Sequence, residues 1–461
     1  MRGHDQTWGY LRCDVSLILS DAYIVSLQTN LAEPSKASSM ANVDRRWFLG
    51  SASFVAGATL LSRAERLKIA NLPVIMKISI LQVPGDFFRP VAMNAYDKRP
   101  VGKNGAIRIV RASLSDGTYG LGVEGYVPIR EAGLSFLKRM IGVSPEAVFV
   151  WQGDHIVGYA PEFESLLRDE QNCWFELVLL DLIGKLKGRP VYSLFGPSVR
   201  DGIDAYDGSL YFVDVATGKG AEQVGQLAKA IRADGYRGLK IKIGRPLKWM
   251  PGEAGVVRDI EAVIAAREAV GANMNLMADA NNGYQGHFDW AVRLLRECSP
   301  YGLNWIEEIF PETVQEYGDL LHSIREINAD TPVADGESVR NMDAFIPFLE
   351  NGLYRYIQPD MRTCGFSKVL YAADLAMPYR ANVAPHNWMS ELGKLACLHA
   401  AKIKRNIPLV EDDRYHDFAF DSSAYAFRDG QWFVPEKPGW GIELSPEYDY
   451  FAKAGSEIVI V

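Results

Sequence analysis

The sequence lacks the signatures of several protein classes. It has 49 Lys and Arg residues against 57 Asp and Glu residues, a net charge of −8, so it has no basic excess for a phosphate backbone and we expect no nucleic-acid partner. Its five cysteines are scattered and form no CxxC pair, which indicates buried free thiols rather than a disulfide framework or a zinc site. The apolar stretch at 48–61 is shorter than the about 20 residues needed to cross a bilayer.

What remains is the composition of a soluble globular protein. Of the 461 residues, 48% are hydrophobic and 23% are charged, which is a typical balance for a chain that buries a large core. The length predicts two domains, or one large barrel with an attached domain.

The N-terminal part resembles an export signal. Arg45 and Arg46 precede the modest apolar stretch at 48–61, which is the pattern of a twin-arginine signal. We expect Met40 to be the true start, residues 1–39 to be a non-native or disordered extension, and 40–75 to be the signal peptide and linker. The protein would then be periplasmic and free of the membrane after processing. The alternative is a cytoplasmic protein with an amphipathic or disordered tail that contains the arginine pair by chance.

The segment from 76 to 202 predicts a smaller α+β domain. The runs at 76–81 and 106–114 are rich in Val and Ile and predict strands. Apolar residues at helical spacing predict a helix over 175–186, which ends before Gly188.

From 203 to 416, short apolar runs alternate with segments of helix length, which predicts a parallel α/β barrel. The eight strand candidates are 205–210, 238–243, 275–278, 304–306, 333–334, 356–358, 382–384 and 408–410. No amphipathic helix follows the last run. The tail at 417–461 reads as strands and loops that return to the N-terminal domain.

Seven consecutive candidate strands end in charged side chains. In chain order these are Lys240 with Lys242, Asp279, Glu307, Glu337, Asp360, His386 and Glu411. A single acid after a strand is more often a helix cap than a ligand, but burying so many charges together without a function would be costly. In a barrel, all of them would surround the C-terminal mouth, where barrel enzymes keep their active sites.

Three of the acids suit a hard divalent cation. Asp279, Glu307 and Glu337 would offer oxygen ligands from adjacent strands, as Mg²⁺ prefers, and no Cys or His cluster offers a zinc or iron alternative. We therefore predict Mg²⁺ as the cofactor. Asn281, two residues beyond Asp279, would orient a ligand or touch the substrate.

The other charged residues predict two bases. Lys240 and Lys242 alternate on one strand and point to the same side, where like charge and burial would lower the pKa of a lysine toward that of a general base. Asp360 and His386 would form a dyad in which the carboxylate orients the imidazole. A substrate between Lys242 and His386 could lose a proton on one face and gain one on the other.

The motifs together resemble the mandelate racemase/muconate lactonizing enzyme branch of the enolase superfamily. Enzymes of this superfamily use a Lys or His base together with Mg²⁺. The similar stretches are Leu239–Gly244, Met277–Asn281, Trp305–Glu308, Asp335–Glu337, Ile357–Asp360, Ala384–Trp388, Leu182–Lys185, Gly188–Tyr192 and Pro438–Glu443. The resemblance covers about residues 76 to 461.

The resemblance implies a (β/α)7β modified TIM barrel with an α+β N-terminal capping domain, which explains the missing last helix. It implies that Lys242 is the base, that Lys240 is its electrostatic partner, and that Glu411 is a hydrogen-bonding group near the substrate carboxylate. Substrate choice would fall to the segment at 83–100, where Arg89 would meet an anion. It also implies a homo-oligomer.

The implied reaction is dehydration of an acid sugar, an aldonate or aldarate, to a 2-keto-3-deoxy acid, with protonated His386 expelling the hydroxyl. Racemisation or epimerisation of a 2-hydroxy acid is one alternative, and a barrel that binds an acidic ligand without turnover is another. One departure stands out: Ile309 and Phe310 separate the Glu307–Glu308 pair from Pro311. The L-rhamnonate dehydratase-like members share such an interruption but generally lack the lysine pair, so their substrate is not transferred.

Overall fold

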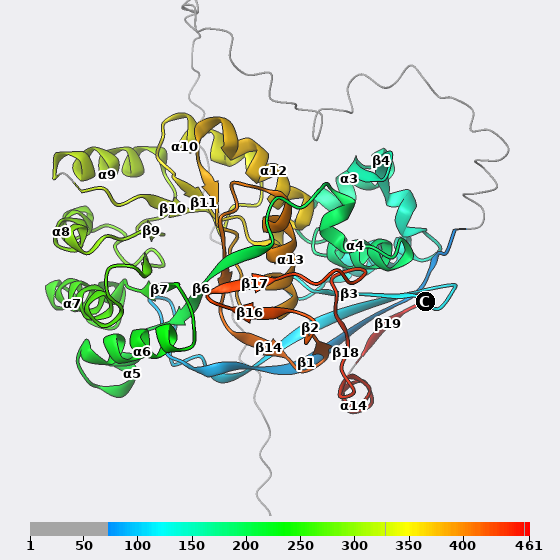
Figure 1. Cartoon of the computed structure of the whole chain (residues 1–461), viewed down its shortest axis with the longest axis horizontal. Coiled ribbons are helices and arrows are strands. Elements are labelled where there is room, and N and C mark those ends of the chain that lie inside the picture. Colours follow the sequence, from blue (N-terminus) through cyan, green and yellow to red (C-terminus); the bar gives the residue numbers. More distant parts are fainter. Residues whose placement is uncertain (1–71, 328, 456) are drawn as a thin grey trace, which may run out of the picture. The chain divides into compact units, whose positions relative to one another are not determined.

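The computed structural model describes residues 72–327, 329–455 and 457–461 (Figure 1). The extension predicted at 1–39 and the predicted twin-arginine signal with Arg45 and Arg46 lie outside the described residues. No helix in the described part of the chain combines the length and apolar character that a bilayer crossing needs.

The N-terminal sheet is antiparallel and includes strands from both ends of the described chain. β1 (Ile75–Val91) pairs with β2 (Gly102–Leu114), and β2 pairs with β3 (Tyr119–Val123). From the C-terminal segment, β14 (Tyr415–Asp417) and β19 (Ile458–Ile460) pair with β1. Both strands predicted in this region are confirmed, and the C-terminal segment returns to them.

Three helices follow β3 in this region, of which α4 (Phe175–Leu186) packs on the sheet. The others are α2 (Glu131–Met140) and α3 (Pro161–Arg168), and a hairpin of β4 (Phe149–Gln152) and β5 (His155–Tyr159) lies between α2 and α3 in the chain. The helix predicted at 175–186 is confirmed. It packs closely on β3, because a Cβ at Gly120 would lie 2.5 Å from Leu182 Cγ and one at Gly122 would lie 2.5 Å from Val178 Cγ2.

The main sheet contains all eight strands predicted between 203 and 416. They are β6 (Gly202–Leu210), β7 (Gly238–Lys242), β8 (Asn275–Asp279), β9 (Trp305–Glu307), β10 (Val333–Asp335), β11 (Tyr356–Ile357), β12 (Asn382–Val383) and β13 (Leu409–Asp412). They pair in parallel in the order β13-β6-β7-β8-β9-β10-β11-β12. The described residues show no ladder between β12 and β13, so the predicted closed barrel is not a continuous hydrogen-bonded ring; the fold is α/β with one central sheet.

One face of this sheet, the inner face, curves so that side chains from distant strands meet in one cluster. One small apolar cluster contains Tyr206 of β6, Met277 of β8, Trp305 of β9, Ala334 of β10 and Ala384 just after β12. Strands at both ends of the hydrogen-bonded order therefore contribute to the same interior. The Val383 amide also donates to the Asn406 carbonyl at 2.7 Å, which ties β12 to the turn before β13.

Helices connect the strands and cover the outer face. Their bounds are α5 (Val213–Thr217), α6 (Glu222–Ala233), α7 (Glu253–Val270), α8 (Phe288–Cys298), α9 (Val314–Glu326), α10 (Ile346–Glu350), α11 (Met361–Cys364), α12 (Phe366–Ala376) and α13 (Glu391–Ile403). Figure 1 shows α6 to α9 in a row along β7 to β10. No helix directly follows β13. Instead β17 (Gln431–Phe433) pairs antiparallel with β6 and with β16 (Ala426–Arg428), so part of the tail extends the main sheet, which the sequence did not predict. The predicted domain boundaries stay predictions.

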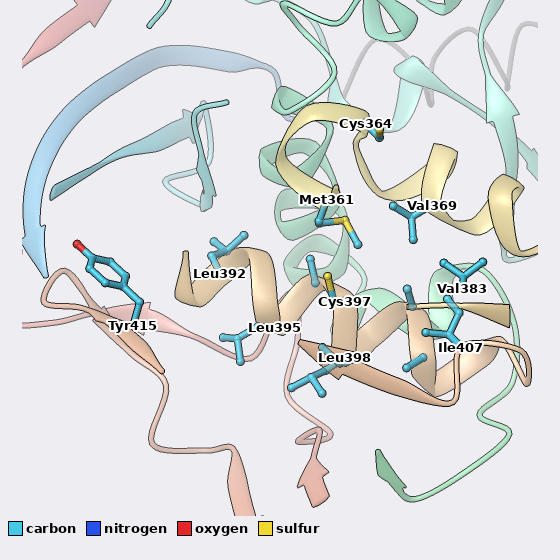
Figure 2. Packing of buried hydrophobic residues seen from close by; sticks show 14 of the residues in the cluster. Met361, Cys364, Val369, Val383, Leu392, Leu395, Cys397, Leu398, Ile407 and Tyr415 are labelled. Atoms are coloured by element: carbon cyan, nitrogen blue, oxygen red, sulfur yellow. The ribbon is translucent and has the colours of Figure 1, made fainter. Parts of the chain in front are cut away.

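Helix α13, which precedes β13, is almost entirely buried. Ser390 caps its N-terminus by accepting from the Gly393 amide at 2.9 Å. Figure 2 shows Cys397 pointing toward Met361 of α11 and Leu398 pointing to the opposite side of the helix. Apolar burial on both sides holds this helix between α11 and β13.

His399 of α13 is fully buried and joins three parts of the chain. The Tyr192 amide donates to Nδ1 at 3.0 Å, and Nε2 lies 2.9 Å from the Tyr425 hydroxyl, which donates to the Trp440 carbonyl. Because Nδ1 accepts a hydrogen bond, the ring is neutral. Burial lowers the pKa of His399 to about 3.

We predict that this histidine makes the protein less stable in acid. The unfolded chain protonates the ring near pH 6.5 and the folded chain only near pH 3, so the unfolded state binds more protons between these values and stability falls as the pH drops through this window. Between pH 7 and pH 5 the loss from His399 alone is about 2 kcal/mol. Urea unfolding at both pH values should show a smaller loss in His399→Gln than in the wild type; equal losses would contradict the assignment.

Candidate functional site

Strand register brings the predicted lysines and acids together. Lys240 is aligned with Met277, and Lys242 is aligned with Asp279, which is in turn aligned with Glu307. Since side chains alternate along a strand, these residues share the inner face with the small apolar cluster.

The ammonium of Lys240 lies at the centre of this group. Its Nζ is 2.7 Å from Glu307 Oε1, 2.8 Å from Glu411 Oε1 and 3.3 Å from Asp279 Oδ2. Lys242 pairs with the same Asp279 oxygen. The ring of Tyr211 lies beneath Lys242, with Nζ 5.3 Å from the ring centroid. All of these charged side chains are almost completely buried.

Glu307 has two further partners. Trp305 Nε1 donates to its Oε2 at 3.0 Å, and Gln358 Nε2 donates to the same oxygen at 2.7 Å. Burial raises the pKa of Glu307 to about 7 although Lys240 lowers it. Gln358 was not predicted as a site residue, although it lies in the Ile357–Asp360 motif.

The predicted dyad is present at the ends of β11 and β12. His386 Nδ1 is 2.6 Å from Asp360 Oδ2, and His386 Nε2 is 3.1 Å from Glu337 Oε2. The Tyr126 hydroxyl donates to Asp360 Oδ2 at 2.8 Å. Burial disfavours a charged ring, but Glu337 and Asp360 outweigh it and raise the pKa of His386 to about 10. The imidazole is therefore protonated at neutral pH.

The lysine pKa values differ from the prediction. Burial does disfavour both ammonium groups, but Glu307 and Glu411 raise the pKa of Lys240, and Asp279 raises the pKa of Lys242. The prediction considered the repulsion between the two lysines and not the carboxylates around them. Lys242 can act as a base only when another positive charge binds Asp279, because Asp279 then no longer holds the lysine in its protonated form.

The residues fit a divalent cation by their chemistry. The carboxyl groups of Asp279, Glu307, Glu308, Glu337, Asp360 and Glu411 outnumber the bases Lys240, Lys242 and His386 by 6 − 3 = 3. The described residues contain no group of three acids already converged on one point, because the lysines and His386 pair with them. Asn281 donates to Glu308 at 2.9 Å, but its buried Oδ1 has no partner. An oxygen-rich, net negative set with an orphaned amide oxygen is what Mg²⁺ with its water shell would satisfy.

The position of Arg89 corrects the prediction that this residue meets an anionic substrate. Its Nη2 lies 2.5 Å from Asp234 Oδ2, in a network that Arg414 shares at 2.6 Å. Asp234 directly follows α6, so Arg89 is held against the helix layer and not beside the lysines or His386.

Two tyrosines from the N-terminal domain, and not Arg89, contact residues at the ends of the central strands. The Tyr96 hydroxyl is 2.5 Å from Asn282 Nδ2, and burial with the nearby charges of Glu308 and Glu337 raises the pKa of Tyr96 to about 12. The second is Tyr126, which contacts the dyad. Tyr96 lies within the segment at 83–100 predicted to choose the substrate, whereas no sequence signal pointed to Tyr126.

We predict that Tyr126→Phe lowers turnover by about tenfold, because one hydrogen bond to a charged carboxylate is worth about 1.5–3 kcal/mol and only part of it bears on orienting His386. The measurement is kcat and KM for the variant and for Tyr119→Phe. The Tyr119 hydroxyl also donates to a carboxylate, Glu443 at 2.6 Å, but away from the strand ends. Equal effects of the two changes would contradict a positioning role for Tyr126.

Comparisons with known proteins give one matching family model and several similar proteins. Residues 223–448 match the family described as "Enolase C-terminal domain-like". The chain is 28% identical over 283 residues to a D-galactarolactone cycloisomerase from Agrobacterium fabrum, covering 59% of this chain and 70% of that protein. The matched segments span between 62% and 70% of the length of the curated relatives.

Two solved structures from Geobacillus are similar over the described chain. One is a galacturonate dehydratase solved with D-galacturonate and 5-keto-4-deoxy-D-galacturonate, with a TM-score of 0.72 and 26% identity, covering 84% of this chain and 99% of that one. The other is a mandelate racemase/muconate lactonizing protein from strain Y412MC10 solved with magnesium and tartrate, with a TM-score of 0.72 and 26% identity, covering 84% and 97%.

Proposed function

We propose that this chain is an enzyme of the mandelate racemase/muconate lactonizing enzyme branch of the enolase superfamily, an assignment that the family-model match and the similar structures support. It would remove the proton next to a carboxylate and dehydrate an acid sugar to a 2-keto-3-deoxy acid. The observation that carries the proposal is the pair of buried proton-transfer groups. Lys242 ends β7 and pairs with Asp279 at the end of β8. The Asp360–His386 pair lies beyond the ends of β11 and β12.

Magnesium is the cofactor, in keeping with the magnesium-bound structures of similar proteins. Asp279, Glu307 and Glu337 would hold it. When bound, it supplies the positive charge that stabilises the enediolate formed from the substrate carboxylate. The central sheet would correspond to the (β/α)7β barrel and the N-terminal sheet with its helices to the capping domain.

In the proposed reaction, the neutral amine of Lys242 takes the proton from the α-carbon, and that C–H bonding pair becomes the enediolate double bond. The imidazolium of His386 gives its proton to the hydroxyl on the next carbon. As the C–O bond breaks, the double-bond pair of the enediolate shifts to lie between the α-carbon and this next carbon, which gives an enol, and water leaves with the C–O bonding pair. The enol takes a proton at the third carbon and becomes the 2-keto-3-deoxy acid. Lys240 helps by holding positive charge beside Lys242 and Glu307.

The pairing of His386 with Asp360 supports the assignment of acid, because Asp360 is not one of the proposed magnesium ligands and favours a ring that holds a proton for a leaving hydroxyl. Glu411, held by the Asn387 amide at 3.3 Å, would bind near the substrate carboxylate. Asn281 and Tyr96 would contact the hydroxyl-bearing part. Export through the twin-arginine signal and assembly into a homo-oligomer belong to the same proposal.

A second candidate is racemisation or epimerisation of a 2-hydroxy acid. The same two groups favour it, since a proton removed by Lys242 could be replaced from His386 on the other face. The two reactions differ only in whether a hydroxyl lies on the neighbouring carbon in reach of His386.

The proposed function is tested by incubating the protein and Mg²⁺ with a panel of aldonates, aldarates and simple 2-hydroxy acids. Formation of a 2-keto-3-deoxy acid, trapped as its semicarbazone, would support dehydration and name the substrate. Inversion at the α-carbon without loss of water would replace dehydration by the second candidate. Neither product from any acid would contradict both.

A further inference from the structure

We propose that a cavity outside the proposed active site binds a small oxyanion, a phosphate or a carboxylate. The cavity has a volume of about 340 Å³ and lies where the end of α3, the segment after β10 and helix α12 meet. Its lining includes Arg168, Glu170, Arg340, Asp343, Lys368 and Tyr371. This volume lies within the range of about 300–1,000 Å³ that small-molecule sites occupy.

Lys368 of α12 is the strongest sign of an anion. The residue is 8% exposed, and its Nζ donates to the Arg168 carbonyl at 2.8 Å and to the Arg340 carbonyl at 3.3 Å. In the part of the chain that the structure describes, no carboxylate lies within ion-pair distance of it. A buried charge without a counter-charge is costly. The third N–H of the ammonium remains available for a ligand in the cavity.

Arg340 adds a second positive charge. Its Nη1 donates to the Glu337 carbonyl at 2.7 Å, and over residues 72–327, 329–455 and 457–461 no ion pair involves its guanidinium. The guanidinium fork matches the oxygens of a carboxylate or phosphate. Arg340 and Lys368 thus present two cations to one cavity.

The acids that line the cavity do not neutralise these two cations. Asp343 accepts from the Tyr371 hydroxyl at 2.8 Å, and Glu170 is exposed. Arg168 is paired with Glu164. Lys368 and Arg340 are therefore the lining cations without an ion-pair partner among the described residues. This predicts a compact anion as the ligand rather than a cation or an apolar molecule.

The test is thermal unfolding of the metal-free protein in inorganic phosphate, in tartrate and in sodium chloride of equal ionic strength. Phosphate or tartrate, but not chloride, should raise the melting temperature. Lys368→Met should weaken that oxyanion's binding by at least tenfold. Lys402→Met is the matched control and should leave it unchanged, since Lys402 is also a buried lysine, on neighbouring α13, that donates to a backbone carbonyl, but it has Asp201 3.9 Å away.

The anion that raises the melting temperature identifies the ligand class. A rise in phosphate alone indicates a phosphate site, and a rise in tartrate that Lys368→Met removes indicates a carboxylate site. If Lys368→Met does not fold, Arg340→Gln should weaken binding by at least fivefold. No shift with either oxyanion, or a shift that both variants retain, would overturn the proposal. Tartrate belongs to the proposed substrate class, so the shift alone does not assign the site. The loss of the shift in Lys368→Met or Arg340→Gln, in protein without Mg²⁺, assigns binding to this cavity independently of the proposed function.

Discussion

Replacing Lys242 with alanine is expected to lower the rate of α-proton removal by about 10³-fold or more. General bases contribute about 10²–10⁴-fold, and no other described base occupies the same position on β7, since Lys240 is held by Glu307 and Glu411. The measurement is turnover and exchange of the α-proton in D₂O, for the acid that the panel identifies.

The control for this prediction is Lys394→Ala. Lys394 is as buried as Lys242 and is also paired with a carboxylate, Asp412 at 3.3 Å, but it lies on α13 away from the inner face. Its replacement should change the exchange rate by less than tenfold in protein that remains folded. Equal losses in the two variants would mean that the loss reflects disturbed packing, and an unchanged rate in Lys242→Ala would remove this residue as the base.

The second large effect is expected for Asp279→Asn, which should weaken Mg²⁺ binding by about 100-fold and abolish turnover. The change removes one of the three acids proposed to hold the ion, and the ligand oxygens of Mg²⁺ sites are mostly charged carboxylates. Titration calorimetry with MgCl₂ measures the affinity directly. Stabilisation of the protein by Mg²⁺ in thermal unfolding gives a second readout that needs no substrate.

Asp335→Asn serves as the comparison, because Asp335 is a fully buried acid at the end of β10 whose carboxylate is engaged by the Tyr317 hydroxyl instead of the lysines. It should bind Mg²⁺ within a few-fold of the wild type. If Asp279→Asn bound Mg²⁺ normally and Asp335→Asn did not, the ligands would have to be reassigned to the other side of the strands.

Much of the fold follows from the sequence because the parallel strands are short, apolar and regularly spaced. Each strand predicted between 203 and 416 is present, and the charges that follow them meet because parallel strands end at the same edge of a sheet. The contacts of Lys240 and His386 could be anticipated in this way, since their partners also end neighbouring strands.

Other features depend on contacts that spacing does not specify. Tyr126 reaches Asp360 across 234 positions of the chain, and Arg89 is held by Asp234 across 145, so neither placement follows from strand periodicity. The pairing of β17 with β6 joins residues more than 220 positions apart and likewise follows from no local pattern. The direction of the lysine pKa shifts required the full set of neighbouring charges, of which the predicted lysine–lysine repulsion was only one part.

The central claim is that this protein removes a proton next to a carboxylate, and proton NMR in D₂O tests it most directly. The protein, Mg²⁺ and the panel of acid sugars and 2-hydroxy acids would be incubated, and the α-proton signal of each acid followed over time. We predict that the signal of at least one acid disappears with Mg²⁺ present and persists with Lys242→Ala. Persistence of every α-proton signal with folded, Mg²⁺-loaded wild-type protein would contradict the claim.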